Sequence, residues 1–337
     1  MKPKGIDIHT HVEFAGTFDI LKRRYSEGEI FERFAVSATG RRSAELNRGI
    51  VAAIRDALRD PQKKIRDMDA TGIAFSVLSS TPFGFFYEVE DDLAVELARF
   101  QNDQIAEMVK KHPDRFAAMA TLPLQVPGEA LKELRRATKD LGLRGVEIGS
   151  HVAKRELADE AFFPVYAALQ ELDMPMFIHP HHVAGLDRLL EYYLNNLIGN
   201  PLDTTIAAAN LIFGGVLEKF PRLKVILAHA GGQFPYIIGR WEHGYKVRPE
   251  CKDRVRQPPM AFFKNFYYDI ITHNPDALRY LISLAGSDHV LLGSDYPYDM
   301  GDLNPVQTLT RLKEIKADDR QKILRENAIS LYGLKAL

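Results

Sequence analysis

Short apolar runs alternate with longer amphipathic segments along the 337 residues of this chain. Eight of the short runs have the length and apolar content of buried β-strands: Ile6–His11, Ile73–Ser79, Phe116–Thr121, Gly145–Gly149, Met176–His179, Val225–His229, Phe266–Ile270 and Val290–Ser294. Segments between them carry apolar residues at helical spacing: Asp92–Lys111, Gly128–Leu141, Ala161–Leu172, Thr204–Phe220, Pro235–Gly244 and Pro275–Ala285.

The regular alternation of strands and helices predicts a parallel sheet, and eight strands predict its closure into a (β/α)8 TIM barrel. An open doubly wound sheet is the alternative. It is disfavoured because no Gly-x-Gly-x-x-Gly turn follows the first strand.

The first two predicted strands are separated by an unusually long segment. We expect one domain over residues 1–337, with residues 13–61 inserted after the first strand. In a barrel this insertion lies at the face where active sites form, so we interpret it as a cap. A surface excursion that only covers the barrel rim is the alternative.

Charge and cysteine content narrow the class of protein. The net charge of −1 gives no global field that would attract nucleic acid or an anionic membrane. The single Cys251 excludes an internal disulfide and fits a reducing compartment. Neither a signal-peptide core nor an apolar run of membrane-spanning length is apparent, so we expect a cytoplasmic protein.

Two histidines at the end of the first strand are the strongest chemical signal. Alternate side chains of a strand share one face, so His9 and His11 are expected to point the same way. Two imidazoles on one face can bind one divalent cation. Alone, His-x-His is a weak signal.

Three more candidates fall at strand ends: His179, His229 and Asp295. In a parallel barrel those ends converge on one rim. A single histidine in such a place is usually a structural, hydrogen-bonded residue, but the shared position of all five favours a metal site. Imidazoles and a carboxylate suit Zn²⁺ or another borderline metal, which lowers the pKa of a bound water towards neutrality.

Four motifs give the chain a family resemblance: Asp-Ile-His-Thr-His, Phe-Ile-His-Pro, Leu-Ala-His-Ala-Gly-Gly and Leu-Gly-Ser-Asp-Tyr-Pro. With supporting stretches at 66–73, 121–125, 145–149, 217–221 and 239–240, the chain resembles the amidohydrolase superfamily over nearly its whole length. It is most similar to the decarboxylase branch, typified by the 2-amino-3-carboxymuconate-6-semialdehyde decarboxylases.

The resemblance implies one zinc ion held by His9, His11, His179 and Asp295, with Mn²⁺, Fe²⁺ or Co²⁺ as alternatives. It implies His229 as the general base, beside Asp295 as the second catalytic residue. Bimetallic members carry a lysine on the fourth strand, where this chain has Glu147. One metal is therefore expected, and Glu147 could orient a ligand, bind metal or form an ion pair, for example with Arg144.

Substrate recognition departs from the family pattern. Arg240 and Arg248 match two family arginines that bind the substrate carboxylate. An arginine expected from a neighbouring subunit falls on Gly244, and another falls on Ala52, with Arg48 and Arg55 nearby.

Other candidates surround the predicted site. His181 and His182 could bind substrate or supply an acid–base group, or could be loop surface. Phe83 belongs to an aromatic loop that could form an apolar wall or simply pack. Asp269, at the end of the seventh strand, could steady a neighbouring group.

These residues favour the function of a metal-dependent decarboxylase without an organic cofactor, which acts on an aromatic or muconate-like carboxylate. Metal-bound hydroxide and the His229 base would carry the reaction. A hydrolase or hydratase using the same site is the alternative, and a non-catalytic binding barrel is disfavoured because no ligand is missing. The resemblance implies a homodimer, with a small carboxylate as the other partner.

Overall fold

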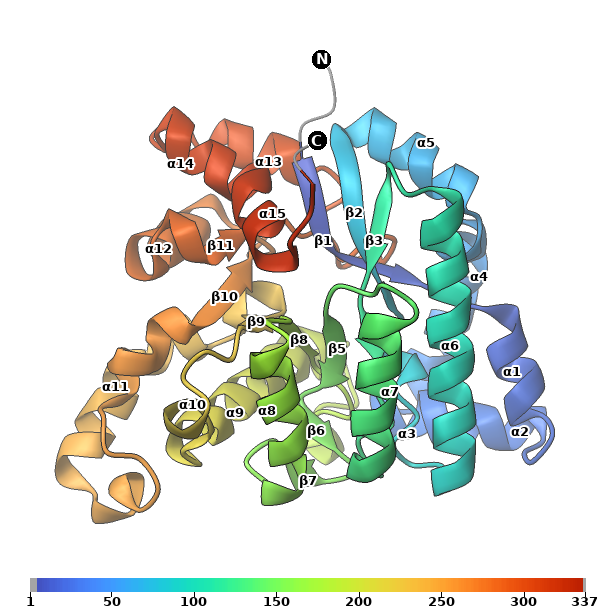
Figure 1. Cartoon of the computed structure of the whole chain (residues 1–337), viewed down its shortest axis with the longest axis horizontal. Helices are drawn as coiled ribbons and strands as arrows, with labels where there is room; N and C mark the ends of the chain where they lie inside the picture. Colours follow the sequence, from blue (N-terminus) through green and yellow to red (C-terminus); the bar gives the residue numbers. More distant parts are fainter. Residues whose placement is uncertain (1–4, 336–337) are drawn as a thin grey trace.

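Parallel strands form a barrel in the computed structural model, which describes residues 5–335 (Figure 1). Around the barrel they follow in chain order: β1 (Gly5–Val12), β2 (Ile73–Ser80), β3 (Phe116–Ala118) with β4 (Ala120–Thr121), β5 (Val146–Gly149), β8 (Met176–His179), β9 (Val225–Leu227), β10 (Phe266–Asp269) and β11 (Val290–Leu291). A small antiparallel hairpin of β6 (His151–Val152) and β7 (Arg155–Glu156) follows β5.

Two connections complete the ring. β3 pairs with β2 and β4 pairs with β5, so the two short strands together make one barrel position. The N–H of Ile8 in β1 donates to the carbonyl of Leu292 after β11 at 3.0 Å, and Thr10 bridges to Tyr296. All eight predicted strands are present, which confirms the (β/α)8 barrel.

Helices cover the outside of the barrel. They are α6 (Asp91–Lys111), α7 (Pro127–Lys139), α8 (Phe163–Glu171), α9 (Asn200–Phe213), α10 (Val216–Lys219), α11 (Phe234–Val247), α12 (Pro275–Ala285), α13 (Pro305–Arg311), α14 (Ala317–Gln321) and α15 (Asn327–Tyr332). The single helix predicted over Thr204–Phe220 is wrong, because the chain breaks at Gly215. That residue has φ +75°, and a Cβ there would lie 2.4 Å from a backbone oxygen of Arg254.

The segment between β1 and β2 is helical. It contains α1 (Ala15–Leu21), α2 (Glu27–Ile30), a π-helical stretch (Phe31–Val36), α3 (Ser37–Thr39), α4 (Arg41–Arg59) and α5 (Pro61–Thr71). Ile20, Tyr25 and Phe34 pack with Phe86 and Leu97 in a separate apolar cluster. This cluster attaches the insertion to α6 and to the loop after β2.

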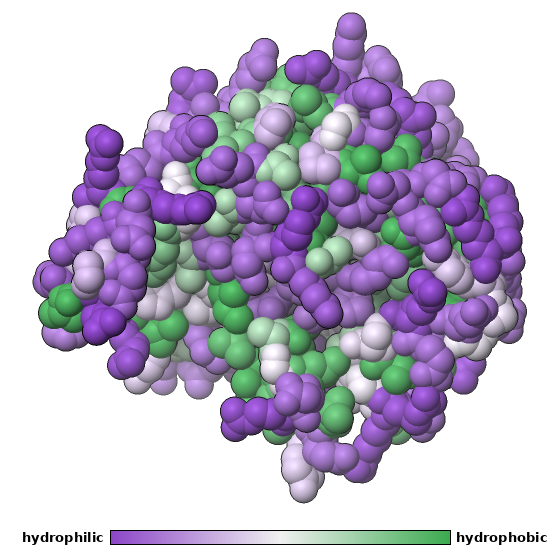
Figure 2. Space-filling view, turned by 90° about the horizontal axis from the view of Figure 1, so that it is seen from below, coloured by the Kyte–Doolittle hydropathy of each residue, from purple (hydrophilic) through white to green (hydrophobic). Residues whose placement is uncertain are grey.

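The barrel interior is filled by apolar side chains from alternate positions of the strands, including Ile6, Ile8, Phe75, Val77, Phe177, Ile226 and Leu291. A larger apolar layer lies between the strands and the surrounding helices. One face of the molecule is mostly hydrophilic, with smaller apolar areas between the polar side chains (Figure 2). None of the helices in residues 5–335 is long and apolar enough to cross a membrane.

Candidate metal centre

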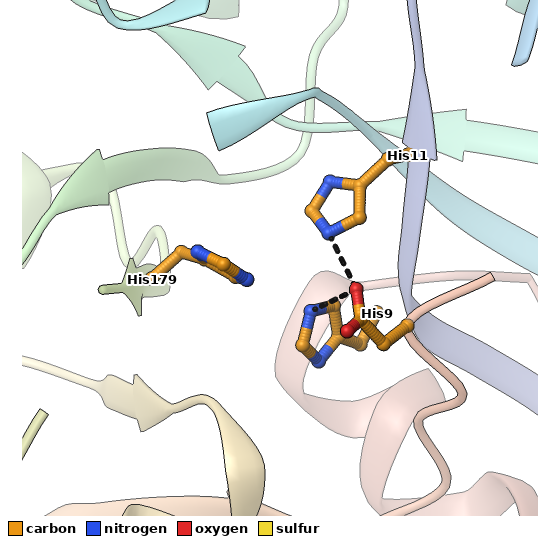
Figure 3. Close-up of side chains that lie close together, drawn as sticks. His9, His11 and His179 are labelled. Atoms are coloured by element: carbon orange, nitrogen blue, oxygen red, sulfur yellow. Dashed lines mark ion pairs between the residues drawn. The ribbon is translucent and has the colours of Figure 1, made fainter. Parts of the chain in front are cut away.

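Four buried side chains converge at the carboxyl ends of the barrel strands. One donor atom from each of His9, His11, His179 and Asp295 lies within 4.8 Å of the others. Asp295 Oδ1 is 3.4 Å from His9 Nε2 and 3.1 Å from His11 Nε2. The three imidazole rings face a common centre (Figure 3). The structure therefore brings together the four residues predicted as ligands.

A bulge in β1 places its two histidines. Asp7 pairs with Ser76 and Thr10 with Leu78, so β1 advances by three residues while β2 advances by two. An extra residue in one strand changes which face its later side chains occupy. Ile8 can therefore fill the barrel interior while His9, the next residue, also points inward, with its ring centroid 4.8 Å from that of Phe177.

The imidazoles are oriented by hydrogen bonds on their outer nitrogens. Nδ1 of His9 lies 2.8 Å from Asp269 Oδ2, Nδ1 of His11 lies 3.1 Å from the Ser80 carbonyl, and Nδ1 of His179 lies 2.9 Å from the Pro180 carbonyl. Donation from Nδ1 leaves each Nε2 with a lone pair directed at the centre.

Within residues 5–335 those three Nε2 atoms and Asp295 Oδ1 are buried without a hydrogen-bond partner. Buried polar atoms without a partner are costly, and a cation at the centre would satisfy all four. The donor set of three imidazoles and one carboxylate fits a borderline divalent metal.

Asp269 ties the metal centre to the loop after β9. Besides His9, it accepts the backbone N–H groups of His229 at 2.9 Å and Ala230 at 2.7 Å. Burial would raise the pKa of Asp269, but the hydrogen bond and charge of His9 outweigh burial and lower it. Asp269 is thus ionised, and the prediction that it steadies a neighbouring group is confirmed.

The charges at the centre favour a cation. Burial would lower the pKa of His9, but Asp295 and Asp269 outweigh it and raise the pKa to about 10. Burial would raise the pKa of Asp295, but the charge of His9 and the close approach of the other histidines outweigh burial and hold this pKa well below its usual value. The carboxylate retains its charge, and a divalent ion can take the place of the proton on His9.

His229 lies beside the four donors. Its side chain follows β9 from a left-handed backbone conformation, with φ +53°. Its Nε2 is 3.6 Å from Asp295 Oδ2, and its ring centroid is 5.0 Å from that of His179. This position next to the centre suits a group that exchanges a proton with substrate or water. Its role as the base remains a prediction.

Glu147 is fully enclosed in the barrel. The ion pair that we considered with Arg144 is not formed, because Arg144 is exposed while Glu147 is buried. Its Oε1 lies 3.8 Å from His11 Nδ1, and neither carboxyl oxygen makes a well-formed hydrogen bond to residues 5–335. Burial raises the pKa of Glu147 well above its usual value, which favours a neutral acid behind His11.

A cavity of about 590 Å³ opens above the metal centre. Its wall comes from the insertion, the loop after β2, and the segment after β8. Phe83, His181 and His182 line it, as does Tyr298, whose ring centroid is 5.6 Å from that of His11. Sequence reasoning missed Tyr193 and the asparagines that line this cavity, Asn47, Asn195, Asn196 and Asn200.

The cationic side chains of the cavity are not the two predicted ones. Arg240 and Arg248 are exposed on and after α11 and do not line the cavity of the single chain. Arg248 instead pairs with Glu250, Nε to Oε1 at 2.8 Å. Arg48 and Arg55 of α4 line the cavity, one turn to either side of the family position on Ala52.

Comparison with known proteins identifies the class to which this fold and site belong. A family model described as amidohydrolase matches residues 6–334, and the chain belongs to this family. It is 34% identical to a 2-amino-3-carboxymuconate-6-semialdehyde decarboxylase of Dictyostelium discoideum, over 98% of this chain and 91% of the relative. The resemblance inferred from the motifs is confirmed.

Solved structures of decarboxylases are also similar to this chain. The 5-carboxyvanillate decarboxylase of Sphingomonas paucimobilis superposes with a TM-score of 0.84 at 26% identity, over 99% of this chain and 100% of that one. The enzyme of the same name from Novosphingobium aromaticivorans, in complex with manganese and 4-hydroxy-3-methoxy-5-nitrobenzoic acid, has a TM-score of 0.84 at 26% identity, over 98% and 96% of the two chains. The chain thus lies in the decarboxylase branch of its family.

Proposed function

We propose that this protein is a metal-dependent decarboxylase of an aromatic or unsaturated, muconate-like carboxylic acid, with no organic cofactor. The observation that carries the proposal is the buried group of His9, His11, His179 and Asp295, which meets the cavity through His179 and Asp295, with His229 beside it. The decarboxylase relatives, one acting on an unsaturated substrate and one bound to an aromatic acid, support the reaction and the substrate class.

The chemistry divides between the ion and the protein. A divalent cation held by the four donors supplies Lewis acidity that stabilises negative charge developing on the substrate. When the carbon–carbon bond breaks, its electron pair remains on the organic carbon and the carboxylate carbon leaves as carbon dioxide. We assign to His229, whose Nε2 is 3.6 Å from Asp295 Oδ2, the transfer of the proton that this carbon then takes up.

The cavity wall supplies recognition of a planar anion. Phe83 and Phe86 offer aromatic surface, and the volume of about 590 Å³ accommodates a single substituted ring. Four cations line the cavity. Lys22 pairs with Glu27 and Arg59 pairs with Glu13. Arg48 and Arg55 form no ion pair within residues 5–335, and the guanidinium of Arg48 stacks 4.5 Å above the ring of Phe31. These two arginines are the cavity cations available to a second carboxylate or phenolate of the substrate.

Arg240 and Arg248 keep their proposed role only in an assembly. Both are exposed, so they can meet substrate if a second copy of the chain brings α11 to the cavity mouth. We therefore propose a homodimer. We also propose zinc as the resident ion, because the donor set is rich in imidazole, with manganese as the alternative from the Novosphingobium aromaticivorans enzyme. The single Cys251 supports a cytoplasmic location.

A second candidate function is a hydrolase or hydratase of the same superfamily. It is favoured by one observation, that His181 lines the cavity and could protonate a leaving group. The two candidates differ in whether a carbon–carbon bond breaks.

The experiment is a substrate panel with the metal-reconstituted protein. Aromatic and muconate-type carboxylates are compared with esters, amides and enones, and carbon dioxide and product mass are recorded. Carbon dioxide from a carboxylate substrate, lost on chelation and restored by metal, supports the decarboxylase. Turnover of an ester, amide or enone without carbon dioxide moves the assignment to the second candidate.

A further inference from the structure

Glu88, His181 and His182 form a second group of metal-type donors in the molecule. One donor atom of each lies within 4.8 Å of the others. Glu88 stands in the turn before α6, and the two histidines follow β8. None of these three residues belongs to the centre formed by His9, His11, His179 and Asp295. Both histidines line the same cavity.

The spacing within this group fits a metal ion better than direct hydrogen bonds. His181 Nε2 is 3.5 Å from Glu88 Oε1, and His182 Nε2 is 3.8 Å from Glu88 Oε2. Hydrogen bonds between such atoms are about 2.7–3.2 Å long. Donors bound at about 2.0–2.2 Å to one tetrahedral zinc ion stand roughly 3.3–3.6 Å apart.

The nitrogens of both histidines lack a partner. Nε2 of His181 and Nε2 of His182 are buried without a hydrogen bond to residues 5–335. The His181 side chain is only 5% exposed, so solvent does not satisfy its nitrogen. A cation would satisfy a buried imidazole nitrogen that faces a carboxylate and a second imidazole.

The backbone holds the two rings in place. His182 has φ +49°, in the left-handed region, and its ring centroid is 4.1 Å from that of His181. His151 Nε2 lies 3.0 Å from the backbone carbonyl of His182, and the backbone N–H of His181 donates to Ser150 Oγ at 3.2 Å. Strained conformations persist where the surroundings fix them, and they gather at functional sites.

We propose that Glu88, His181 and His182 bind a second divalent ion of the zinc class, more weakly than the first centre. Weaker binding follows because there are three donors rather than four and the Glu88 side chain is 32% exposed. Two neutral imidazoles and one carboxylate leave a net positive charge on the ion. Its open coordination position then attracts an anionic oxygen entering the cavity.

The test counts metal in the purified holoenzyme during a titration with Co²⁺ alone. Total bound metal and the visible absorption of Co²⁺ are followed together. We expect the wild type to rise from one to two equivalents. Glu88→Gln, which keeps the shape and removes the charge, weakens the second equivalent at least about tenfold, as does His181→Gln.

His243→Gln is the matched control, because His243 is exposed on α11 and is remote in sequence from the group. It should bind two equivalents, as the wild type does. A wild type that stays at one equivalent overturns the proposal, and so does either cluster variant if it binds the second ion as tightly as the wild type. The readout is metal content, so it is independent of whether the protein decarboxylates anything.

Discussion

The carboxylate of Asp269 lies 2.8 Å from Nδ1 of His9 and also accepts the backbone N–H of His229 at 2.9 Å. One buried side chain therefore orients a proposed metal ligand and fixes the turn that carries the proposed base. Partners of this kind set the tautomer of a ligating imidazole and raise its basicity. The proposed metal centre and the proposed acid–base group are built as one unit.

Replacing Asp269 with asparagine tests this unit. The amide nearly preserves the shape but removes the charge that stabilises donation from His9, so metal affinity should fall by about 10- to 100-fold. Affinity is measured by competition with a chelator. Asp253→Asn, at an exposed acid after α11, serves as the control and should bind metal as the wild type does. Equal affinities in the two variants would show that Asp269 does not support the centre.

The variant His229→Gln tests whether His229 acts as the base or as a metal ligand. We expect kcat for decarboxylation to fall by about 10²- to 10⁴-fold with one metal ion still bound, because His229 is not among the four grouped donors. Metal content and steady-state rates are measured on the same preparation. Loss of the metal together with activity would make His229 a ligand, and unchanged activity would remove it from the reaction.

Gly293→Ala should damage the centre through packing. A Cβ at this position would lie 2.8 Å from Asp269 Cβ and 3.0 Å from His9 Cβ, which is closer than side chains tolerate. We expect loss of metal affinity and a destabilisation of about 1–3 kcal/mol. Gly239→Ala in α11 is the control, since nothing lies within 4 Å of the added methyl group. That control should be stabilised by about 0.5–1 kcal/mol. Equal effects in chemical unfolding would contradict the packing argument.

The burial of Glu147 should make the stability of the protein depend on pH. Its pKa is raised by burial in the folded protein, so above about pH 4.5 the unfolded chain releases a proton that the folded protein keeps. The free energy of unfolding then falls as pH rises, by up to about 1.4 kcal/mol per pH unit. Glu147→Gln lacks this loss, so its stability relative to wild type should improve from about pH 5 to about pH 7. Parallel unfolding curves across that range would show that Glu147 is ionised when folded.

The barrel and the five strand-end candidates were predictable because they follow from periodicity, whereas the choice of four ligands among the five came from the family resemblance. Each of His9, His11, His179 and Asp295 stands at or just after the carboxyl end of an apolar strand, and parallel strands bring such ends together. Alternation along β1 predicts that His9 and His11 share a face. The bulge before Thr10 is what turns this face towards the barrel interior.

The residues that line the cavity and the break between α9 and α10 could not be predicted, because they depend on features without a repeating sequence pattern. Tyr193 lines the cavity from the connection after β8, Asn195 from a π-helical stretch (Asn195–Gly199) and Asn200 from the first residue of α9, and the path of this connection is set by tertiary packing. The helix breaks where Gly215 takes a left-handed backbone conformation, and a side chain at this position is excluded by the backbone of Arg254, which lies far along the chain. The arginines that face the cavity come from α4, whose position over the barrel the sequence alone does not fix.

The most direct test of the central claim follows the carboxyl carbon. The metal-loaded protein is given the best substrate of the panel, labelled with ¹³C in its carboxylate, in water enriched in ¹⁸O. Our account predicts one labelled carbon dioxide for each product and no ¹⁸O in the organic product, with the release of labelled carbon dioxide slowed by about 10²- to 10⁴-fold in His229→Gln. Product that keeps the labelled carboxyl carbon and gains ¹⁸O would contradict it and make the protein a hydrolase or hydratase.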